Sequence, residues 1–577
     1  MRRAALLVGL AAVIAALGLL AVPPAGLRQW LFALTGEENA LSQVRGLGQL
    51  ASDLIRPPLD LQPEVPIAHN GVNPFGINTF LQHEVEPAKR ERQAQLIAAA
   101  GFHWLRQEFP WADIEISAKG NFEDCRNGPC LSAWDKYDQI VGLAEAHGLE
   151  VLVRLSSPPD WSRADGAARG SFAPPDDFAD FADYAAAVAE RYRGRLRYYQ
   201  VWNEPNGNDE WGYQPADPEA YARLLCAAYQ RLKSVDPDVV VVAAALTPAT
   251  DLNLYNPNGL GGTNLNDFVF LQRMYNAGAG ECFDVMSVQG YGLWSGPTDQ
   301  RNRPLIVNYG RNQFIRDLMV KNGDAGKAIW IAEMNWNAVP PNSGIPPAFG
   351  QVSPEQQARY APLAYQRAQA EWPWVGVNAF WFFKRASDAE RNQAWYYFRM
   401  ADPDFTLQPV YASLQAYTHQ TPVMYPGYFQ EDHWAVAWSG AWQDARQAGA
   451  VLGGVRLATA PDAAASFVFE GTDLILVTQQ GPEAGTLSVR VDGGQAQALN
   501  LQAATASGPT YKSVAQGLAN GRHSIEITSS AGQNAIDGFI VRRTPQRTGM
   551  LVLGLMGILG IMWIVSKRMK APKDSAG

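Results

Sequence analysis

Between about residue 73 and residue 420, short apolar runs alternate with longer segments whose apolar residues recur at helical spacing. Such short runs are typical of buried strands, and the longer segments are typical of amphipathic helices. The predicted strands are 76–80, 103–109, 150–155, 196–203, 239–246, 285–291, 328–333 and 377–383. The predicted helices are 88–100, 133–147, 177–193, 218–235, 265–277, 311–322, 354–371 and 410–417. Eight strand-then-helix units predict a (β/α)8 TIM barrel over 73–420, which is an α/β fold, rather than an open doubly wound sheet.

A different pattern begins near Tyr428. Short apolar runs are separated by turn sequences rich in Gly, Asp and Asn, and no helix of useful length interrupts them. The runs are 465–469, 474–478, 487–491, 523–528 and 536–541. This pattern predicts an antiparallel, jelly-roll-like β-sandwich over 428–543.

Each end of the chain carries an apolar run long enough to cross a bilayer as a transmembrane helix. Residues 4–22 follow two arginines, and residues 549–565 precede a basic tail over 566–577. A pair of prolines after the first run disfavours cleavage, so residues 1–26 are predicted to be an uncleaved signal-anchor in preference to a removed signal. The basic residues at both ends place these ends in the cytoplasm and everything between them outside it.

The segment between the first apolar run and the barrel has two parts. Residues 27–55 carry apolar side chains at helical spacing, which predicts an amphipathic stalk beside the membrane. Residues 57–66 are rich in proline and predict a semi-rigid linker. Residues 27–72 are therefore expected to connect the anchor to the barrel.

The composition narrows the class of protein. Hydrophobic residues make up 47% of the chain and charged residues 18%, as in packed globular proteins and unlike disordered ones. The net charge of −9, with no basic block before the C-terminal tail, argues against a nucleic-acid partner. The seven His and four Cys lack metal-ligand spacing, and no phosphate-binding GxxxxGK sequence is present. We therefore expect neither a metal nor a cofactor.

The cysteines suit disulfides if the chain lies outside the cytoplasm. Cys125 and Cys130 bracket a turn-rich segment, which predicts a small loop-closing disulfide. Cys226 and Cys282 are a candidate second pair.

Two glutamates stand at the ends of predicted barrel strands. Glu204 follows the fourth strand, just before a proline that cannot continue the strand, and Glu333 ends the seventh. Because the carboxyl ends of barrel strands meet at one mouth, we expect these two carboxyls to face each other. Such a pair suits glycoside hydrolysis, in which one carboxyl protonates the leaving oxygen and the other attacks the anomeric carbon. A structural ion pair of Glu204 with an arginine is the alternative interpretation.

The motifs Trp202-Asn203-Glu204-Pro205 and Trp330-Ile331-Ala332-Glu333 together resemble the catalytic signature of the clan A retaining glycoside hydrolases. Within that clan the chain is most similar to family 39 and to the cellulase-like family 5, over roughly residues 73–420. The resemblance implies that Glu204 is the general acid/base and that Glu333 is the nucleophile of a double-displacement reaction on β-linked glycans.

The resemblance also implies roles around the two glutamates. Asn203 would bind the sugar 2-hydroxyl, Arg106 and Tyr291 would orient the nucleophile, and Trp381 would form the floor of subsite −1. Where the clan often carries histidine, two residues before the sixth-strand tyrosine, this chain carries Gln289, a candidate substrate ligand. Its amide can form hydrogen bonds but cannot take a charge.

The residues by themselves leave other interpretations open. Arg106 could be a structural ion-pair partner of Glu108 or of another acid, and Trp381 could be a core residue. Tryptophans on mouth-side loops could bind outer sugars or pin their loops; they are Trp161, Trp211 and Trp294.

The sequence therefore predicts a cell-membrane-anchored retaining glycosidase that cleaves a β-linked poly- or oligosaccharide outside the cytoplasm. Two alternatives stay open. One is a glycan-binding cell-envelope protein that keeps the barrel as a scaffold, and the other is a transglycosylase that uses the same covalent intermediate.

Overall fold

The structure is a computed structural model that describes residues 25–53, 55–250 and 264–544. The two predicted membrane segments, 4–22 and 549–565, and the basic tail 566–577 lie outside these residues. Among the described residues, no helix combines the length and the apolar character needed to cross a membrane.

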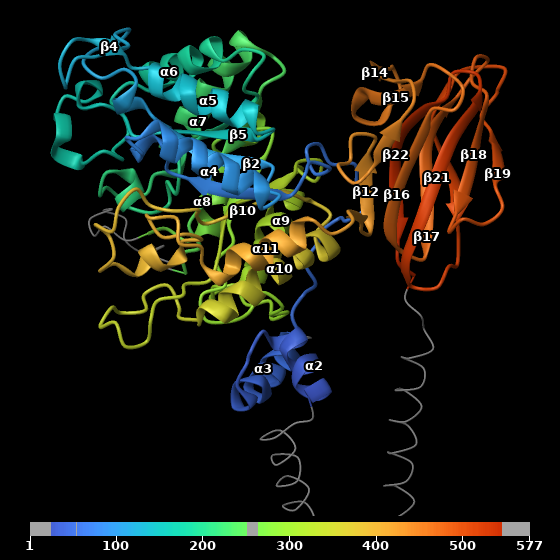
Figure 1. The fold of residues 1–577 in the computed structure, drawn as a ribbon, viewed down its shortest axis with the longest axis horizontal. Helices are drawn as coiled ribbons and strands as arrows, with labels where there is room; N and C mark the ends of the chain where they lie inside the picture. The colour runs from blue at the N-terminus through green and yellow to red at the C-terminus, as the bar shows by residue number, and fades with distance from the viewer. Residues whose placement is uncertain (1–24, 54, 251–263, 545–577) are drawn as a thin grey trace, which may run out of the picture.

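Parallel strands form the central sheet of the larger domain (Figure 1). In chain order they are β1 (Phe75–Thr79), β2 (Trp104–Pro110), β5 (Glu150–Ser156), β6 (Tyr198–Val201), β7 (Val240–Ala243), β8 (Met286–Gln289), β9 (Ile329–Met334) and β10 (Val375–Phe380). β1 pairs with both β2 and β10, and parallel bridges from Val242 to Val285 and from Leu246 to Val288 join the β7 and β8 sides. These pairings close the sheet, so the predicted TIM barrel is confirmed.

Helices cover the outside of the barrel, and their starts are encoded locally. They are α4 (Pro87–Ala99), α5 (Asp135–Ala146), α6 (Phe178–Arg191), α7 (Pro218–Val235), α8 (Asp267–Asn276), α9 (Asn312–Lys321), α10 (Pro354–Glu371) and α11 (Pro409–Thr418). α7 and α10 have the predicted bounds at both ends. Each begins with proline after a residue whose side chain caps the helix, Asp217 for α7 and Ser353 for α10.

The segment predicted as one stalk forms two helices, α2 (Ala25–Thr35) and α3 (Ala40–Asp53), that pack against the barrel. The break has a local cause. Gly36 has a φ of +65°, which favours glycine and ends α2, and the Asn39 side chain accepts a hydrogen bond from the Leu41 amide at 2.9 Å and starts α3. The spacing of apolar residues continues across this break, so periodicity alone does not reveal it.

Arg301, in the connection between β8 and α9, fastens α2 and α3 to the barrel. It donates to the Thr35 carbonyl at 3.0 Å, to Glu37 Oε1 at 2.7 Å and to Gln49 Oε1 at 2.7 Å. The residue is only 4% exposed and also pairs with the buried Asp299. The N-terminal helices are therefore fixed to a barrel loop through a buried charge.

The C-terminal domain consists of two facing sheets, which confirms the predicted β-sandwich. One has the order β11-β16-β21-β18-β19 with β13 beside β16, and the other has the order β14-β15-β22-β17-β20 with β12 beside β22. The strands are β11 (Val423–Met424), β12 (Gly427–Gln430), β13 (Ala437–Ser439), β14 (Trp442–Arg446), β15 (Gly454–Ala458), β16 (Ala464–Gly471), β17 (Asp473–Gln480), β18 (Thr486–Val491), β19 (Gln497–Asn500), β20 (Ser507–Ala515), β21 (Gly521–Ala531) and β22 (Ala535–Arg542). Apolar runs predicted five of these strands. Among the others, β14 and β20 are largely exposed and lack such a run, whereas β11 and β12 are buried but short.

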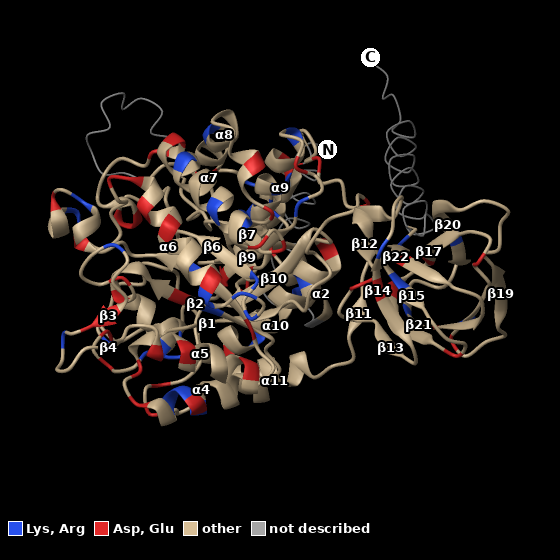
Figure 2. Cartoon of the chain, turned by 90° about the horizontal axis from the view of Figure 1, so that it is seen from above, with Lys and Arg blue, Asp and Glu red and all other residues tan. Residues whose placement is uncertain are grey.

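The sandwich is attached to the end of the barrel opposite the mouth. Trp434 packs edge-on against Phe75, the first residue of β1, with ring centres 5.6 Å apart, and its backbone amide donates to the Gly71 carbonyl at 2.8 Å. Figure 2 shows β11 and β12 on the side of the sandwich that faces the barrel. The contact leaves the carboxyl ends of the barrel strands on the far side.

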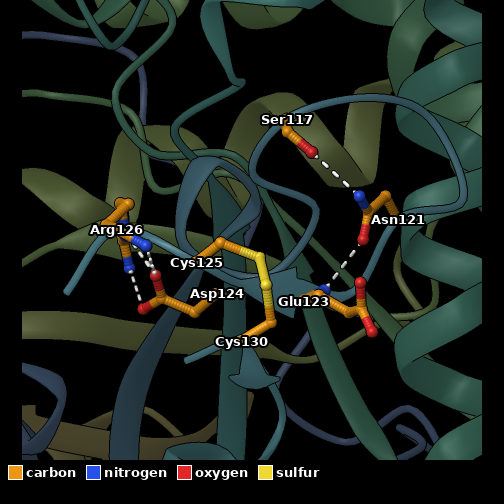
Figure 3. Close-up of a disulfide and its surroundings, with 7 residues drawn as sticks. All are labelled: Ser117, Asn121, Glu123, Asp124, Cys125, Arg126 and Cys130. Carbon is orange, nitrogen blue, oxygen red and sulfur yellow. Dashed lines mark hydrogen bonds and ion pairs between the residues drawn. A yellow bond between two sulfur atoms is a disulfide. The ribbon is translucent and has the colours of Figure 1, made fainter. Parts of the chain in front are cut away.

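Two disulfides cross-link the barrel domain, Cys125 to Cys130 and Cys226 to Cys282. The first closes the tip of a small hairpin, β3 (Glu123–Asp124) and β4 (Leu131–Ser132), in the loop after β2 (Figure 3). Among the described residues, Glu123 and these two sulfurs form the one group with metal-ligand spacing. Because the sulfurs are bonded to each other, they present no thiolate to a metal.

Replacing Arg301 with alanine is expected to loosen α2 and α3. It leaves Asp299 as a buried carboxylate without its guanidinium, so the free energy of unfolding should fall by about 3 kcal/mol. Urea unfolding measures this change, and trypsin cleavage within residues 25–60 reports release of the helices. Arg359→Ala is the matched control, because Arg359 pairs with Glu38 at the same contact but is exposed and should cost at most about 1 kcal/mol. Equal effects of the two substitutions would contradict the role of Arg301.

Candidate active site

The side chains at the mouth of the barrel converge on Arg106 of β2. Its guanidinium donates through Nε to Gln200 Oε1 at 2.7 Å, through Nη1 to Asn78 Oδ1 at 2.8 Å and Glu333 Oε1 at 2.7 Å, and through Nη2 to Asn203 Oδ1 at 2.7 Å. The residue is 3% exposed. One buried cation therefore ties together β1, β6, β9 and the loop after β6.

Aromatic rings fill the barrel below this cation. Trp104, Tyr198 and Trp330 stand near the beginnings of β2, β6 and β9, with ring centres of Trp104 and Tyr198 4.8 Å apart and those of Trp104 and Trp330 5.2 Å apart. Side chains alternate along a strand, so Arg106 and Gln200, each two residues further on, point to the same interior. The rings form an apolar floor, and the polar site lies above it.

Glu333 reaches the mouth through a bulge in β9. The register of β9 shifts by one residue near Ala332 against both β8 and β10, and Asn78 Nδ2 donates to the Ala332 carbonyl at 2.8 Å. In a regular strand Ala332, two residues after the inward-facing Trp330, would face the interior and Glu333 would not. The extra residue turns the Glu333 side chain inward.

Both carboxylate oxygens of Glu333 accept hydrogen bonds. Arg106 donates to Oε1, and the Tyr291 hydroxyl donates to Oε2 at 2.6 Å. Burial, followed by the charge of Glu333, raises the pKa of Tyr291 well above its usual value, so Tyr291 stays protonated and remains a donor. These bonds fix the carboxylate and stabilise its anionic form.

Glu204 stands on a constrained loop and forms no ion pair with any basic residue that the structure describes. Its backbone φ is +38°, and its amide donates to the Ala245 carbonyl at 3.0 Å. The Gln289 amide donates to its Oε1 at 2.6 Å. Burial and then the charge of Glu333 raise the pKa of Glu204 well above its usual value, while the bond from Gln289 opposes the shift. Burial and the charge of Glu333 therefore favour the protonated form of Glu204.

The site thus presents two carboxyl groups in different surroundings. Glu333 accepts hydrogen bonds from Arg106 and Tyr291, whereas Glu204 accepts one from Gln289 and has a raised pKa. One group can attack an electrophilic carbon while the other protonates a leaving oxygen, which is the division of roles in glycoside hydrolysis.

The predicted site residues differ in how they enter this network. Asn203, Arg106 and Tyr291 are joined directly to the hydrogen-bond network of Glu333. The Gln289 side chain donates through Nε2 to Glu204, and the Gln289 Oε1 atom has no partner among the described residues. Trp381 is half-buried after β10, edge-on to Phe80 with ring centres 5.6 Å apart.

The three mouth-side tryptophans have different environments. Trp211 is 3% exposed and packs edge-on against Trp202, so it is a core residue. Trp161 donates to the Glu115 carbonyl at 2.8 Å and packs against Trp111, so it pins its loop. Trp294 is 66% exposed, and its ring is free to stack on a ligand.

Several polar residues of the site were not predicted. Asn78 and Gln200 interrupt apolar strands at inward positions, and such an interruption is the sequence signal that could have revealed them. Arg106 forms an ion pair, but its partner is Glu333 and not Glu108, which pairs with Arg154 at 2.7 Å. Glu210, in the loop after β6, accepts a hydrogen bond from Asn203 Nδ2 at 3.0 Å and lacked any such signal.

Residues 65–272 match the family model described as cellulase (glycosyl hydrolase family 5). The barrel is a glycosidase domain. The match spans β1 to β7 and includes Asn203 and Glu204, which confirms the resemblance drawn from the motifs; it ends before the strand that carries Glu333. No curated protein matches the chain.

Several solved structures are similar to this glycosidase domain and its sandwich. A family 39 glycoside hydrolase from Bacteroides cellulosilyticus WH2 is 16% identical, with 83% of this chain and 82% of that chain covered and a TM-score of 0.45. A family 39 β-xylosidase from Caulobacter crescentus is 15% identical, with coverage of 82% and 99% and a TM-score of 0.43. A glucosidase from Croceicoccus marinus is 13% identical, with coverage of 81% and 98% and a TM-score of 0.44.

Replacing Arg106 with lysine is expected to disable the site although the charge is kept. A single ammonium cannot serve acceptors that lie around a planar guanidinium, so Glu333 loses its fixed orientation. We expect kcat to fall by at least about 100-fold and the free energy of unfolding to fall by about 1–3 kcal/mol. Steady-state kinetics and urea unfolding measure both. The exposed Arg92 of α4 supplies the control Arg92→Lys, and similar kcat values for the two variants would refute the role of Arg106.

Replacing Gln289 with leucine is expected to shift the pH dependence of activity. The lost N–H group stabilised the Glu204 carboxylate, so the pKa of Glu204 should rise further. Because the acid must be protonated to act, the basic limb of the kcat/KM profile should move to higher pH by about 1 unit. The profile is measured on a glycan with a poor leaving group, with Gln313→Leu as a control that has no contact with Glu204. A limb that stays in place or moves to lower pH would refute this role.

Proposed function

We propose that the protein is a retaining glycosidase that hydrolyses β-linked poly- or oligosaccharides outside the cytoplasm. The observation that carries the proposal is the contrast between Glu333, whose two oxygens accept bonds from Arg106 and Tyr291, and Glu204, which is buried without a cation. The contrast supplies a nucleophile at the end of β9 and an acid in the loop after β6.

The reaction proceeds in two displacements. In the first, a Glu333 oxygen bonds to the anomeric carbon while the bond to the leaving oxygen breaks, and that oxygen takes the Glu204 proton. In the second, Glu204 takes a proton from water, the water oxygen bonds to the anomeric carbon, and Glu333 leaves as a carboxylate.

The charge of Glu333 couples these two steps. It is one of the causes that raise the pKa of Glu204 in the free enzyme. When Glu333 becomes an ester its negative charge disappears, and the pKa of Glu204 falls. Glu204 is therefore an acid in the first step and a base in the second.

The location is part of the proposal. The apolar runs 4–22 and 549–565 would anchor both ends in the membrane, with the barrel and sandwich outside the cytoplasm. The bonded pairs Cys125–Cys130 and Cys226–Cys282 support an oxidising compartment.

A 2-deoxy-2-fluoro glycoside with an activated leaving group tests the mechanism, because the fluorine slows the second displacement and the glycosyl-enzyme accumulates. We expect one added sugar on the peptide that contains Glu333. Glu333→Gln should remain unlabelled, and Glu204→Gln should release no reducing ends from glycans with poor leaving groups. A label on another residue would refute the assignment of the nucleophile. No hydrolysis across a panel of β-glycans would favour the scaffold alternative.

A further inference from the structure

A third carboxyl group, that of Glu210, contacts the motif that carries Glu204. Glu210 lies in a short 3-10 helix, η5 (Asp209–Trp211), after β6. Its Oε1 accepts from Asn203 Nδ2 at 3.0 Å, and its carbonyl accepts from Trp202 Nε1 at 2.9 Å. The loop therefore folds back and fastens both residues that precede the acid/base.

The backbone under this contact is strained. Trp202 has a φ of +74° and Glu204 a φ of +38°. Residues other than glycine rarely adopt positive φ values. Such a conformation persists only where surrounding contacts over-determine it. The two bonds to Glu210, together with the bond from the Glu204 amide to the Ala245 carbonyl, supply those contacts.

Glu210 also fixes which way the Asn203 amide points. The amide oxygen accepts from Arg106 Nη2, and the amide nitrogen donates to Glu210. A flipped amide would direct N–H groups at a guanidinium and its oxygen at a carboxyl, so opposite charges on either side enforce one orientation. One Asn203 N–H remains to be offered to a sugar hydroxyl.

The charges around Asn203 do not balance in pairs. Among the described residues, four carboxyls and two guanidiniums meet here: Glu108, Glu204, Glu210, Glu333, Arg106 and Arg154. Arg106 pairs with Glu333, and Arg154 pairs with Glu108. Glu204 and Glu210 are therefore left without a cation of their own, and Glu210 Oε2 is buried without a partner.

Burial raises the pKa of Glu210 to about 7. Arg154 of β5 and the Asn203 N–H oppose the shift, whereas Glu108 of β2 and the adjacent Asp209 add to it. The influence is mutual. Burial and the charge of Glu333 raise the pKa of Glu204, and a charge on Glu210 raises it further. The ionisation of each group therefore affects the pKa of the other.

We propose that Glu210 is a positioning residue that orients Asn203 and whose ionisation sets the pH at which Glu204 loses its proton. The inference rests on the proposed function, since it assigns Glu204 the role of the acid. Glu210 acts through its neighbours and not on the sugar, because both of its carboxyl oxygens are engaged or buried.

Glu210→Gln separates the charge from the hydrogen bond. A glutamine oxygen can still accept from Asn203, so kcat at acidic pH should stay within about threefold of the wild type. Without the negative charge Glu204 releases its proton more easily, so the basic limb of the kcat/KM profile should move to lower pH by about 0.5–1 unit. Glu210→Ala also loses the orientation of Asn203, and its kcat should fall by at least about tenfold at all pH values.

A spectroscopic measurement tests the titration without a substrate. In pH-difference infrared spectra of the full chain, a protonated-carboxyl band should disappear as the pH rises through about 7, and this band should be absent in Glu210→Gln. Asp209, the exposed residue that directly precedes Glu210, supplies the control Asp209→Asn, which should keep the band.

An unchanged basic limb and an unchanged band in Glu210→Gln would overturn the inference. Loss of the band together with inactivity of the wild type on every glycan would instead refute the proposed function while the titration of Glu210 stands. A Glu210→Gln variant with kcat as low as that of Glu210→Ala would also overturn the inference. The effect of the Glu210 charge would then not be distinct from the effect of its hydrogen bond to Asn203.

Discussion

The site depends on one buried guanidinium, that of Arg106. Removing a guanidinium from water costs several kcal/mol unless its donors are satisfied, and here four side chains accept from it. These acceptors come from β1, β6, β9 and the loop after β6, which meet only when the barrel closes in this register. The cost of burying Arg106 is therefore offset only in the closed barrel, and the closed barrel in turn orients Glu333.

The burial of Arg106 also determines which carboxyl groups at the barrel mouth have a cationic partner. Arg106 pairs with Glu333 and Arg154 with Glu108, and within the described parts of the chain no guanidinium forms an ion pair with Glu204. Gln289 offers Glu204 a neutral amide in the place where the related enzymes often have histidine. A protonated imidazole there would stabilise the Glu204 carboxylate, whereas the amide does so weakly. Gln289 therefore opposes the raised pKa of Glu204 less than a protonated imidazole would.

Much of the architecture could be predicted from the sequence, because periodicity and helix caps are local signals. The first residues of α7 and α10 follow from Pro218, Pro354 and the residues that cap these helices. The bulge that turns Glu333 inward could not be predicted, because it is a relation between β9 and both of its neighbours. The docking of α2 and α3 depends on Arg301, which is distant in the chain. The contact between Asn203 and Glu210 depends on how an irregular loop folds back.

These long-range contacts also connect the N-terminal helices to the site. The loop after β8 begins near Tyr291 and runs to Arg301. Along it, the Gly296 amide donates to the Gly36 carbonyl at 2.7 Å, and the Ser295 carbonyl accepts from Trp336 Nε1 at 2.7 Å. The loop is thus held by α2 and α3 on one side and by the barrel on the other. Since the Tyr291 hydroxyl donates to Glu333, the helices before the barrel help to hold the loop that carries this donor. The sandwich contacts the opposite end of the barrel, where Trp434 packs against Phe75.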